Sequence, residues 1–296
     1  MKKEDKAVCI ILNYNSAELV KELVNNIQNF NSFKDILIVD NKSTDDSYQF
    51  LKDEYANNDK VLIISSHENG GYGYGNNYGI TYASTYLKAQ YAVITNPDVV
   101  FSNDVVEKML ICMQQKKAAI VSATQLLNNK VVSNRGWKIA TPYQWAFNEL
   151  NHRPQCMTKN LYYPSKYFKK EISQVDCVPG AMFLVDIPIF QKVGGYDERM
   201  FLYCEEDTLG YKLKNAGYKT YVMNNVFYKH MHSATIDKSI PDQVAQLRIL
   251  HRSKLIFLDK YLDVGKITLI NEKMLFSLIT MRYYVTSHIK KVLNRK

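Results

Sequence analysis

The chain has 296 residues, of which 46% are hydrophobic and 23% charged, and its formal net charge is +9. This length allows one large α/β domain with an appendage or two small domains, and the composition excludes disordered and fibrous proteins. The five scattered cysteines lack CxxC or Cys/His spacing, which favours reduced thiols in a cytoplasmic protein over a disulfide framework or a zinc site.

The first 125 residues alternate between short apolar runs and segments with apolar residues at helical spacing. The runs are apolar almost throughout, as strands covered on both faces must be. Strands are expected at 7–13, 35–40, 60–66, 91–96 and 118–123, and helices at 16–29, 44–57, 74–87 and 103–115. This order predicts a doubly wound, mainly parallel α/β sheet with right-handed crossovers.

The alternation stops near residue 125. From there to about residue 180 we expect longer loops and a β-hairpin region that contacts substrate. The elements expected beyond it are a short helix at 186–193, a helix at 205–215, two short strands around an Asn224-Asn225 turn, and long helices at 241–262 and 271–294.

Polar residues follow each of the first four expected strands. In parallel α/β sheets, ligands bind outside the carboxyl ends of the strands. Asp40 ends the second strand, where a carboxylate can accept hydrogen bonds from a nucleobase or ribose, although Asp at this place also forms turns. Asp98 follows Pro97 after the fourth strand, where it can ligate Mg²⁺ or Mn²⁺ or simply belong to a turn.

The segment "ENGGYGYGNNYGI" at 68–80 is rich in glycine. Glycines let the backbone approach a ligand closely and expose amide donors near a helix N-terminus. The segment has neither the GxGxxG nor the GK[ST] pattern, so it supports neither a dinucleotide site nor a P-loop. A nucleotide diphosphate is still compatible with it.

Three consecutive acids, Glu205, Glu206 and Asp207, begin the helix expected at 205–215. The helix macrodipole stabilises each acid there by about 0.3–1 kcal/mol, so a capping role is a serious alternative to catalysis. Neighbouring residues differ by roughly 100° around a helix, however, so Glu205 and Glu206 cannot both serve one cap. Further along, His230 and His232 alternate on one face of an expected strand, where they can contact a metal or phosphate or be structural.

Taken together, these motifs resemble the family 2 glycosyltransferases, which are inverting, metal-dependent enzymes with the glycosyltransferase A-type fold. The matching segments lie at 12–15, 39–45, 69–77, 96–99, 179–185, 194–207 and 230–235. The resemblance implies a glycosyltransferase domain over 1–240 and a basic helical extension over 241–296. The domain would consist of a nucleotide-sugar half at about 1–125 and an acceptor half at about 126–240.

The resemblance also implies binding roles for individual positions. The nucleotide would be bound by Asn13, Asn15, Asp40, Asn69, Gly71, Asn76 and Asn96. Asp98 is similar to the last acid of the family's metal-binding DxD motif, and His230 would be a further ligand of Mg²⁺ or Mn²⁺. Asn96 stands where the first Asp of that motif is usual, a variant found in the branch that includes rhamnosyltransferases. The donor and acceptor sugars would be contacted by Pro179, Gly180, Ala181, Asp207 and His232.

The family's catalytic base is the second acid of a pair at the start of a helix, and here that position is Glu206. Glu205 would take the role if the helix began one residue differently. The carboxylate would deprotonate an acceptor hydroxyl that attacks the anomeric carbon, and like charges beside it would raise its pKa.

The resemblance predicts transfer of a sugar, with rhamnose from dTDP-rhamnose as the first guess and a UDP-sugar as the next. The acceptor would be a cell-surface polysaccharide or a lipid-linked oligosaccharide, and no nucleic acid partner is expected. One alternative is a sugar nucleotidyltransferase, which should carry a glycine-rich basic loop after the first strand. The sequence there is "NYNSAEL", without Gly or Lys. Another alternative is a nucleotide-sugar-binding partner that does not catalyse.

The end of the chain holds most of the excess positive charge: residues 248–296 contain eleven Lys or Arg and three acids. An amphipathic stripe is expected on the last helix, formed by Leu275, Leu278, Ile279, Val285, Ile289, Val292 and Leu293. Such a basic helix can lie on the anionic inner face of a plasma membrane. The alternative is a helix that packs on the domain, or on a second copy of the chain in a homodimer.

Overall fold

The structure is a computed structural model that describes residues 6–142, 144, 162–231 and 242–293. Its strands are β1 (Ala7–Asn13), β2 (Phe33–Asp40), β3 (Val61–Ser65), β4 (Tyr91–Thr95), β5 (Val99–Val100), β6 (Ile120–Leu127), β7 (Lys130–Val131), β8 (Ile172–Val175), β9 (Met182–Asp186) and β10 (Thr220–His230). Its helices are α1 (Ala17–Ile27), α2 (Ser47–Glu54), α3 (Tyr72–Thr85), α4 (Asn103–Lys116), the 3₁₀ helix η2 (Ser165–Lys169), α7 (Ile187–Lys192), α8 (Glu205–Asn215), α10 (Gln243–Lys260) and α11 (Lys266–Leu293).

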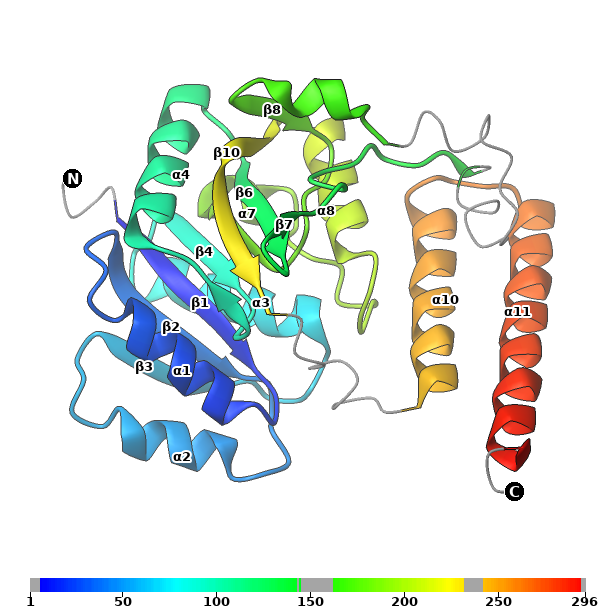
Figure 1. Cartoon of the computed structure of the whole chain (residues 1–296), viewed down its shortest axis with the longest axis horizontal. Coiled ribbons are helices and arrows are strands. Elements are labelled where there is room, and N and C mark those ends of the chain that lie inside the picture. Colours follow the sequence, from blue (N-terminus) through cyan, green and yellow to red (C-terminus); the bar gives the residue numbers. More distant parts are fainter. Residues whose placement is uncertain (1–5, 143, 145–161, 232–241, 294–296) are drawn as a thin grey trace.

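One mixed sheet forms the centre of the molecule, in the order β3-β2-β1-β4-β9-β6-β10-β5 (Figure 1). The strands and helices expected in the first 125 residues are confirmed, with ends within a few residues of the prediction. β1, β2, β3 and β4 are parallel, and Asn13 pairs with Asp40 across β1 and β2. The carboxyl ends of these strands therefore meet at one edge of the sheet, where ligands bind in such folds.

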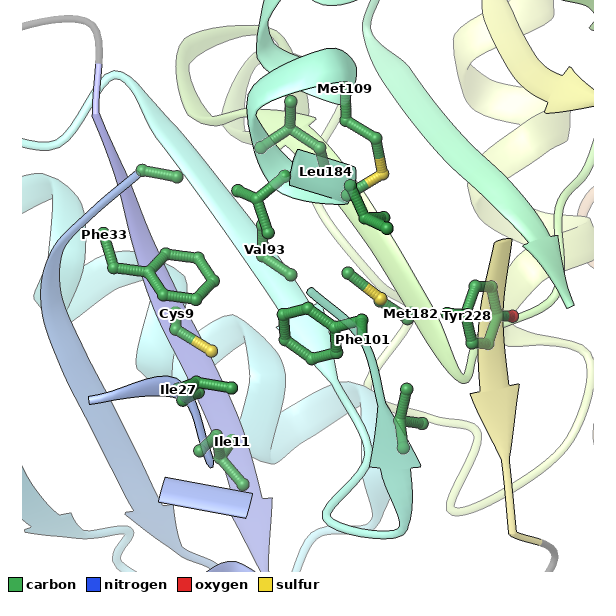
Figure 2. Close-up of a cluster of buried hydrophobic side chains, with 14 of the residues drawn as sticks. Cys9, Ile11, Ile27, Phe33, Val93, Phe101, Met109, Met182, Leu184 and Tyr228 are labelled. Carbon is green, nitrogen blue, oxygen red and sulfur yellow. The ribbon is translucent and has the colours of Figure 1, made fainter. Parts of the chain in front are cut away.

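Helices cover both faces of the sheet, as the apolar strands require. One buried cluster contains residues of α1, α2 and α4, and a second contains residues of α3, α7 and α8. Figure 2 shows part of the first cluster, where Cys9 of β1 lies near Phe33, Ile11 of β1 lies near Ile27 of α1, and Met109 of α4 lies near Leu184. Each of these side chains is 0% or 1% exposed, so this face of the sheet is shielded from solvent.

The sheet departs from a purely parallel order at β9. This strand runs antiparallel between β4 and β6, and Thr95 pairs with Met182. The strand expected at 118–123 is β6, and it is therefore separated from β4. Because β9 begins at the edge where β4 ends, the backbone N–H of Asn96 donates to the carbonyl of Ala181 at 2.8 Å. The 179–181 segment is thereby held beside the carboxyl end of β4.

The prediction of two short strands around Asn224-Asn225 is wrong. Residues 220–230 form the single strand β10, and the register against β6 shifts between Met223 and Phe227. The side chain of Asn224 is buried, and its amide donates to the carbonyl of Lys170 and to the hydroxyl of Ser173. These bonds hold Asn224 inside the fold, so the register shift is an irregularity within one strand.

The expected hairpin region contains β6 and β7, which are antiparallel and joined at Asn128 and Asn129. Both asparagines have positive φ, 49° and 60°, as the central residues of a tight hairpin turn require. Helix α8 begins and ends where the sequence predicted. The helices expected at 241–262 and 271–294 are α10 and α11, and α11 begins five residues early, at Lys266.

Helices α10 and α11 lie side by side at one end of the molecule (Figure 1). Phe257 and Leu258 of α10 are fully buried in a cluster with Met200 and Cys204, which attaches α10 to the loop before α8. The ring of Phe276 on α11 stacks on His251 of α10 at a centroid distance of 4.4 Å. Among the helices that the structure describes, none is long and apolar enough to cross a membrane.

Candidate active site

A cavity of about 560 Å³ lies at the carboxyl edge of the sheet. Segments that are far apart in the sequence line it: Asn96 after β4, the 179–181 segment before β9, the first turn of α8, and His230 at the end of β10. The structure therefore brings together four groups of residues that the sequence predicted as functional. Of the predicted sugar contacts, His232 lies outside the described residues.

An unusual backbone turn precedes the three acids that line the cavity. Tyr203 and Cys204 both have positive φ, 72° and 67°, immediately before α8 begins at Glu205. Such conformations cost about 1–3 kcal/mol each for residues other than glycine, and they persist where the surroundings impose them. Cys204 is buried against α10, which holds this turn in place.

Glu206 is fixed by the backbone of the segment across the cavity. Its Oε1 accepts a hydrogen bond from the N–H of Gly180 at 3.1 Å. Burial raises the pKa of this carboxyl, while hydrogen bonds from its own N–H and from that of Gly180 act in the opposite direction. The carboxylate is thus both oriented and a stronger base than an exposed glutamate.

Glu205 is in a different environment although it is the adjacent residue. It is only 4% exposed, and its Oε1 has no hydrogen-bond partner within the described part of the chain. Burial, followed by the charge of Glu206, raises the pKa of Glu205 well above the usual value. Burial without a hydrogen-bond partner for Oε1 favours the neutral form of this carboxyl.

Asp207 is held by an indole. The Nε1–H of Trp137 donates to its Oδ1 at 2.9 Å. Burial raises the pKa of Asp207 to about 7, the bond from Trp137 opposes this shift, and the charge of Glu206 adds to it. Sequence reasoning missed Trp137, because an isolated Trp in an irregular segment carries no signal of its partner.

Gly180 is confined between two side chains. A Cβ at this position would lie 2.5 Å from Oε1 of Glu206, so the close approach requires glycine. On the other side, the hydroxyl of Tyr72 donates to the carbonyl of Gly180 at 2.8 Å. The sequence placed Gly180 near the sugars, but it did not reveal that Tyr72 of α3 supports the same peptide.

Asp98 and His230 form the second polar centre. β5 pairs with β10 and places Val99 opposite His230, so that Nε2 of His230 lies 3.1 Å from Oδ1 of Asp98. Nδ1 of His230 lies 3.2 Å from the amide of Gln125, and both Asp98 and His230 are largely buried. These two residues were predicted as metal ligands from separate parts of the sequence.

A carboxylate oxygen and an imidazole nitrogen this close together suit a divalent cation such as Mn²⁺ or Mg²⁺. No group of three or more His, Cys, Asp or Glu that could hold a metal was found among the described residues. A two-residue site still fits these ions, since they take the remaining ligands from water and substrate phosphates. The donor set on the protein is therefore compatible with the expected cofactor.

Two predicted nucleotide-binding residues share one network. Asn13 and Asp40 are both buried, and Nδ2 of Asn13 donates to Oδ2 of Asp40 at 2.8 Å. The hydroxyl of Ser43 donates to the same carboxylate at 2.6 Å. Asn15 lies in an exposed loop next to them, where its side chain exchanges hydrogen bonds with Thr44. The structure thus gathers these three residues at the ends of β1 and β2.

The glycine-rich segment packs against protein. Gly71 has φ 93°, and a Cβ there would lie 1.9 Å from the carbonyl oxygen of Phe201. Asn76 is 0% exposed and donates to the carbonyl of Tyr72, so its side chain does not reach the cavity. The contacts of Gly71 and Asn76 with a nucleotide stay predictions. Asn69, which accepts from the amide of Asn41, stays partly exposed.

Comparison with known proteins identifies the family. The model of glycosyl transferase family 2 matches residues 8–194. The chain belongs to this family, which confirms the resemblance seen in its sequence.

Two characterised relatives resemble this chain in sequence. The low-salt glycan biosynthesis hexosyltransferase Agl10 of Haloferax volcanii is 26% identical over 210 residues, which cover 71% of this chain and 62% of that protein. The rhamnosyltransferase WbbL of Escherichia coli is 23% identical over 236 residues, covering 75% of this chain and 83% of WbbL. The chain thus spans less than two thirds of the length of Agl10.

Solved structures show the same fold at low sequence identity. GalNAc-T7 with UDP, GalNAc and Mn²⁺ has a TM-score of 0.65 at 15% identity, covering 86% of this chain and 48% of that one. The mannosyltransferase PcManGT from Pyrobaculum calidifontis with GDP-Man and Mn²⁺ has a TM-score of 0.58 at 13% identity, covering 96% and 75%. These likenesses establish the glycosyltransferase A-type fold.

Proposed function

We propose that the chain is an inverting glycosyltransferase that uses a nucleotide-sugar donor and a saccharide acceptor. The observation that carries this proposal is the placement of Glu206, which is oriented by the N–H of Gly180 in a cavity that Asn96 and His230 also line. Family membership supports the same activity. We also propose a boundary near residue 240 between the glycosyltransferase domain and the basic helical extension. Residues 232–241 lie outside the described part of the chain.

In the proposed reaction, Glu206 removes the proton of an acceptor hydroxyl. The hydroxyl oxygen forms a bond to the anomeric carbon from the side opposite the nucleotide, and the bond from that carbon to the diphosphate oxygen breaks. The nucleotide diphosphate leaves with the electron pair of that bond, and the configuration at the anomeric carbon is inverted. The proton on Glu206 then passes to solvent. The raised pKa of Glu206 suits it to this role.

Asp98 and His230 would hold Mg²⁺ or Mn²⁺ in the proposed enzyme, since their donor atoms fit such an ion. When bound, the ion would neutralise charge on the departing diphosphate. The solved structures of GalNAc-T7 and PcManGT both contain Mn²⁺, which supports the proposal without assigning the metal here.

The donor is proposed from the relatives. Rhamnose from dTDP-rhamnose is the first candidate, because one relative is named a rhamnosyltransferase, and a UDP-sugar is the second. The other relative is a hexosyltransferase of glycan biosynthesis, which supports a growing cell-surface polysaccharide or a lipid-linked oligosaccharide as the acceptor.

The surface of α11 supports peripheral contact with a membrane. Its exposed apolar stripe, 44–77% exposed, consists of Ile267, Ile270, Met274, Leu278, Met281 and Val285. Exposed Lys266, Lys273 and Arg282 lie beside this stripe, while the acid Glu272 is buried. The stripe differs from the expected one, since Leu275 and Ile279 are half-buried and the side chains from 287 onward are not described. If two copies of the chain met through this stripe, the basic residues beside it on each copy would repel one another. This favours an anionic lipid surface over a dimer.

Two other functions are less well supported. A nucleotidyltransferase would not need the oriented base that Glu206 provides, and the family match gives it no support. A binding partner without activity would not need the acid cluster in the cavity. Loss of activity in Glu206→Gln with nucleotide binding retained would separate catalysis from binding.

The direct test is a panel of nucleotide sugars incubated with the protein and Mg²⁺ or Mn²⁺. Release of nucleotide diphosphate is measured with and without lipid-linked saccharide acceptors. We expect acceptor-dependent release from dTDP-rhamnose or from one UDP-sugar, and none with the Glu206→Gln variant. If every donor is inert and neither UDP nor dTDP binds, the glycosyltransferase proposal is wrong.

A further inference from the structure

Lys254 of α10 lies in the wall of the same cavity as the three acids. It is only 7% exposed, although lysines are rarely buried. Among the described residues that line the cavity it is the one Lys or Arg, and the same lining includes three carboxyl groups. Its Nζ lies 6.0 Å from the centre of the Phe276 ring on α11. It also lies outside residues 8–194, the part that the family model matches.

The amine is attached to a rigid part of the molecule. The hydroxyl of Ser253, the residue before it, donates to the carbonyl of Leu202 at 2.7 Å. Phe257, three residues on, is fully buried against Met200 and Cys204. Because both neighbours fix α10 to the loop that leads into α8, the position of Lys254 relative to Glu205 and Glu206 is set by packing.

The burial of Lys254 has an energetic cost. Burial lowers its pKa to about 8, and the charge of Glu272 on α11 acts in the opposite direction. At pH 7 the amine therefore remains mostly protonated. A positive charge on a buried side chain attracts an anion more strongly than an exposed lysine does.

We propose that Lys254 forms an anion subsite of the cavity, which binds a phosphoryl oxygen of a substrate. This inference rests on the proposed transferase function and deepens it, because it assigns a substrate-binding residue to the C-terminal helices. The phosphoryl oxygen can belong to the diphosphate of the donor or to the phosphate of a lipid-linked acceptor. In either case α10 completes the active site, and the helices do more than cover the domain.

A purely structural role is the alternative, in which Lys254 only balances the buried Glu272, which is 6% exposed. Removing one member of a buried charged pair destabilises a protein, whereas replacing both with apolar residues is often neutral. The double variant Lys254→Met/Glu272→Leu therefore restores stability in both cases. It restores binding and activity only if the role is structural.

The test uses the full chain with Lys254→Met, Lys254→Arg and the double variant. Lys260→Met is the matched control, because Lys260 is an exposed lysine of the same helix whose ion pair with Asp259 is on the surface. Binding of UDP, dTDP and GDP is measured by calorimetry. Transfer is measured with a diphosphate-lipid acceptor and with the same saccharide on a neutral aglycone, and thermal unfolding is followed for every variant.

Lys254→Met removes a hydrogen bond to a charged group. We therefore expect either nucleotide affinity or the use of the diphosphate-lipid acceptor to weaken by about tenfold to a hundredfold. If nucleotide affinity falls, the anion is the donor diphosphate. If KM rises only for the diphosphate-lipid acceptor, the anion belongs to the acceptor. Lys254→Arg should retain part of the effect, and Lys260→Met all of the wild-type behaviour.

The proposal is overturned if Lys254→Met binds and reacts like the wild type, or if the double variant recovers both stability and activity. Failure of the glycosyltransferase proposal gives a different result. In that case the wild type transfers no sugar, while reduced nucleotide affinity in a folded Lys254→Met still supports the anion subsite.

Discussion

The N–H of Gly180 donates to Oε1 of Glu206 across 26 residues of sequence, at a distance of 3.1 Å. This bond joins the segment just before β9 to the first turn of α8. The orientation of the proposed base therefore depends on the sheet, because β9 holds Gly180 in place through its pairing with β4.

Gly180→Ala should impair catalysis without unfolding the protein. The new Cβ would lie 2.5 Å from Oε1 of Glu206, and the flexible carboxylate can move away at little cost. A displacement of about 1 Å can reduce turnover by about a hundredfold. We expect kcat to fall by that order, with nucleotide affinity and melting temperature near wild type. Gly265→Ala is the control, since nothing lies within 4 Å of its Cβ. Wild-type kcat in Gly180→Ala would contradict the placement of the base.

Glu206→Gln and Glu205→Gln should differ in activity. A general base contributes about 10²–10⁴ in rate, so Glu206→Gln should lower kcat by that factor. Glu205 has a pKa well above its usual value because it is buried, and a neutral glutamic acid resembles glutamine. Glu205→Gln should therefore change kcat by less than about threefold, far less than the loss of a general base would. Steady-state kinetics with saturating donor compares the two, and the reverse order of effects would assign the base to Glu205.

Asp207 should make the stability of the protein depend on pH. Its pKa rises from 3.8 in the unfolded reference to about 7 in the fold, so the folded state binds more protons between these values. Its contribution to stability is present below pH 3.8 and is lost as the pH rises towards 7. In Asp207→Asn the side chain still accepts the hydrogen bond from Trp137 but cannot ionise. This variant therefore does not lose stability as the pH rises towards 7.

The free energy of unfolding of Asp207→Asn relative to wild type should therefore increase from pH 4 to pH 7 and then level off. One pKa unit corresponds to about 1.4 kcal/mol, and partial exposure reduces the effect, so a gain on the order of 2 kcal/mol is expected at pH 8. Urea unfolding at pH 4, 5.5, 7 and 8 measures it. A difference that does not vary with pH would show that Asp207 is not neutralised by the fold.

The strands, helices and acid motif could be predicted from the sequence because each depends on local pattern. The run at 7–12 is apolar throughout, and α8 has its acids in the first turn and Gly217 after its end. β9 could not be placed in the same way, because its position between β4 and β6 depends on pairing between residues about 90 apart, such as Thr95 and Met182. The irregularity in β10 depends equally on distant partners of Asn224.

The residues of the candidate site, like the elements of the fold, could be predicted only in part. Glu206, Asp98 and His230 were predicted because their residue types suit the chemistry, and the resemblance gave their order. Trp137 and Lys254 could not be predicted, because their roles arise only where Trp137 meets Asp207 and where α10 meets the cavity. Gly71 lies against the carbonyl of Phe201, so glycine here permits close approach to protein as readily as it could to a ligand.

Removal of divalent metal should abolish transfer. With EDTA we expect activity to fall at least about tenfold and to return with Mn²⁺ or Mg²⁺, since the ion stabilises the leaving diphosphate. Asp98→Asn should weaken Mn²⁺ binding in the presence of UDP, measured by electron paramagnetic resonance. Asp104→Asn is the control, because Asp104 is exposed on α4 and pairs with Lys108. Full activity in EDTA would show that the Asp98 and His230 pair serves another purpose.

The outer face of α11 should bind anionic membranes. Met274 and Leu278 are 57% and 65% exposed on the apolar stripe, and the flanking basic residues attract anionic headgroups. Met274→Glu/Leu278→Glu should reduce sedimentation with phosphatidylglycerol vesicles severalfold, and wild type should bind phosphatidylcholine vesicles only weakly. Ile111→Glu is the control, because Ile111 is 50% exposed on α4, away from the stripe. If the double variant instead converts a dimer to a monomer in light scattering while vesicle binding is unchanged, the stripe contacts a second copy of the chain.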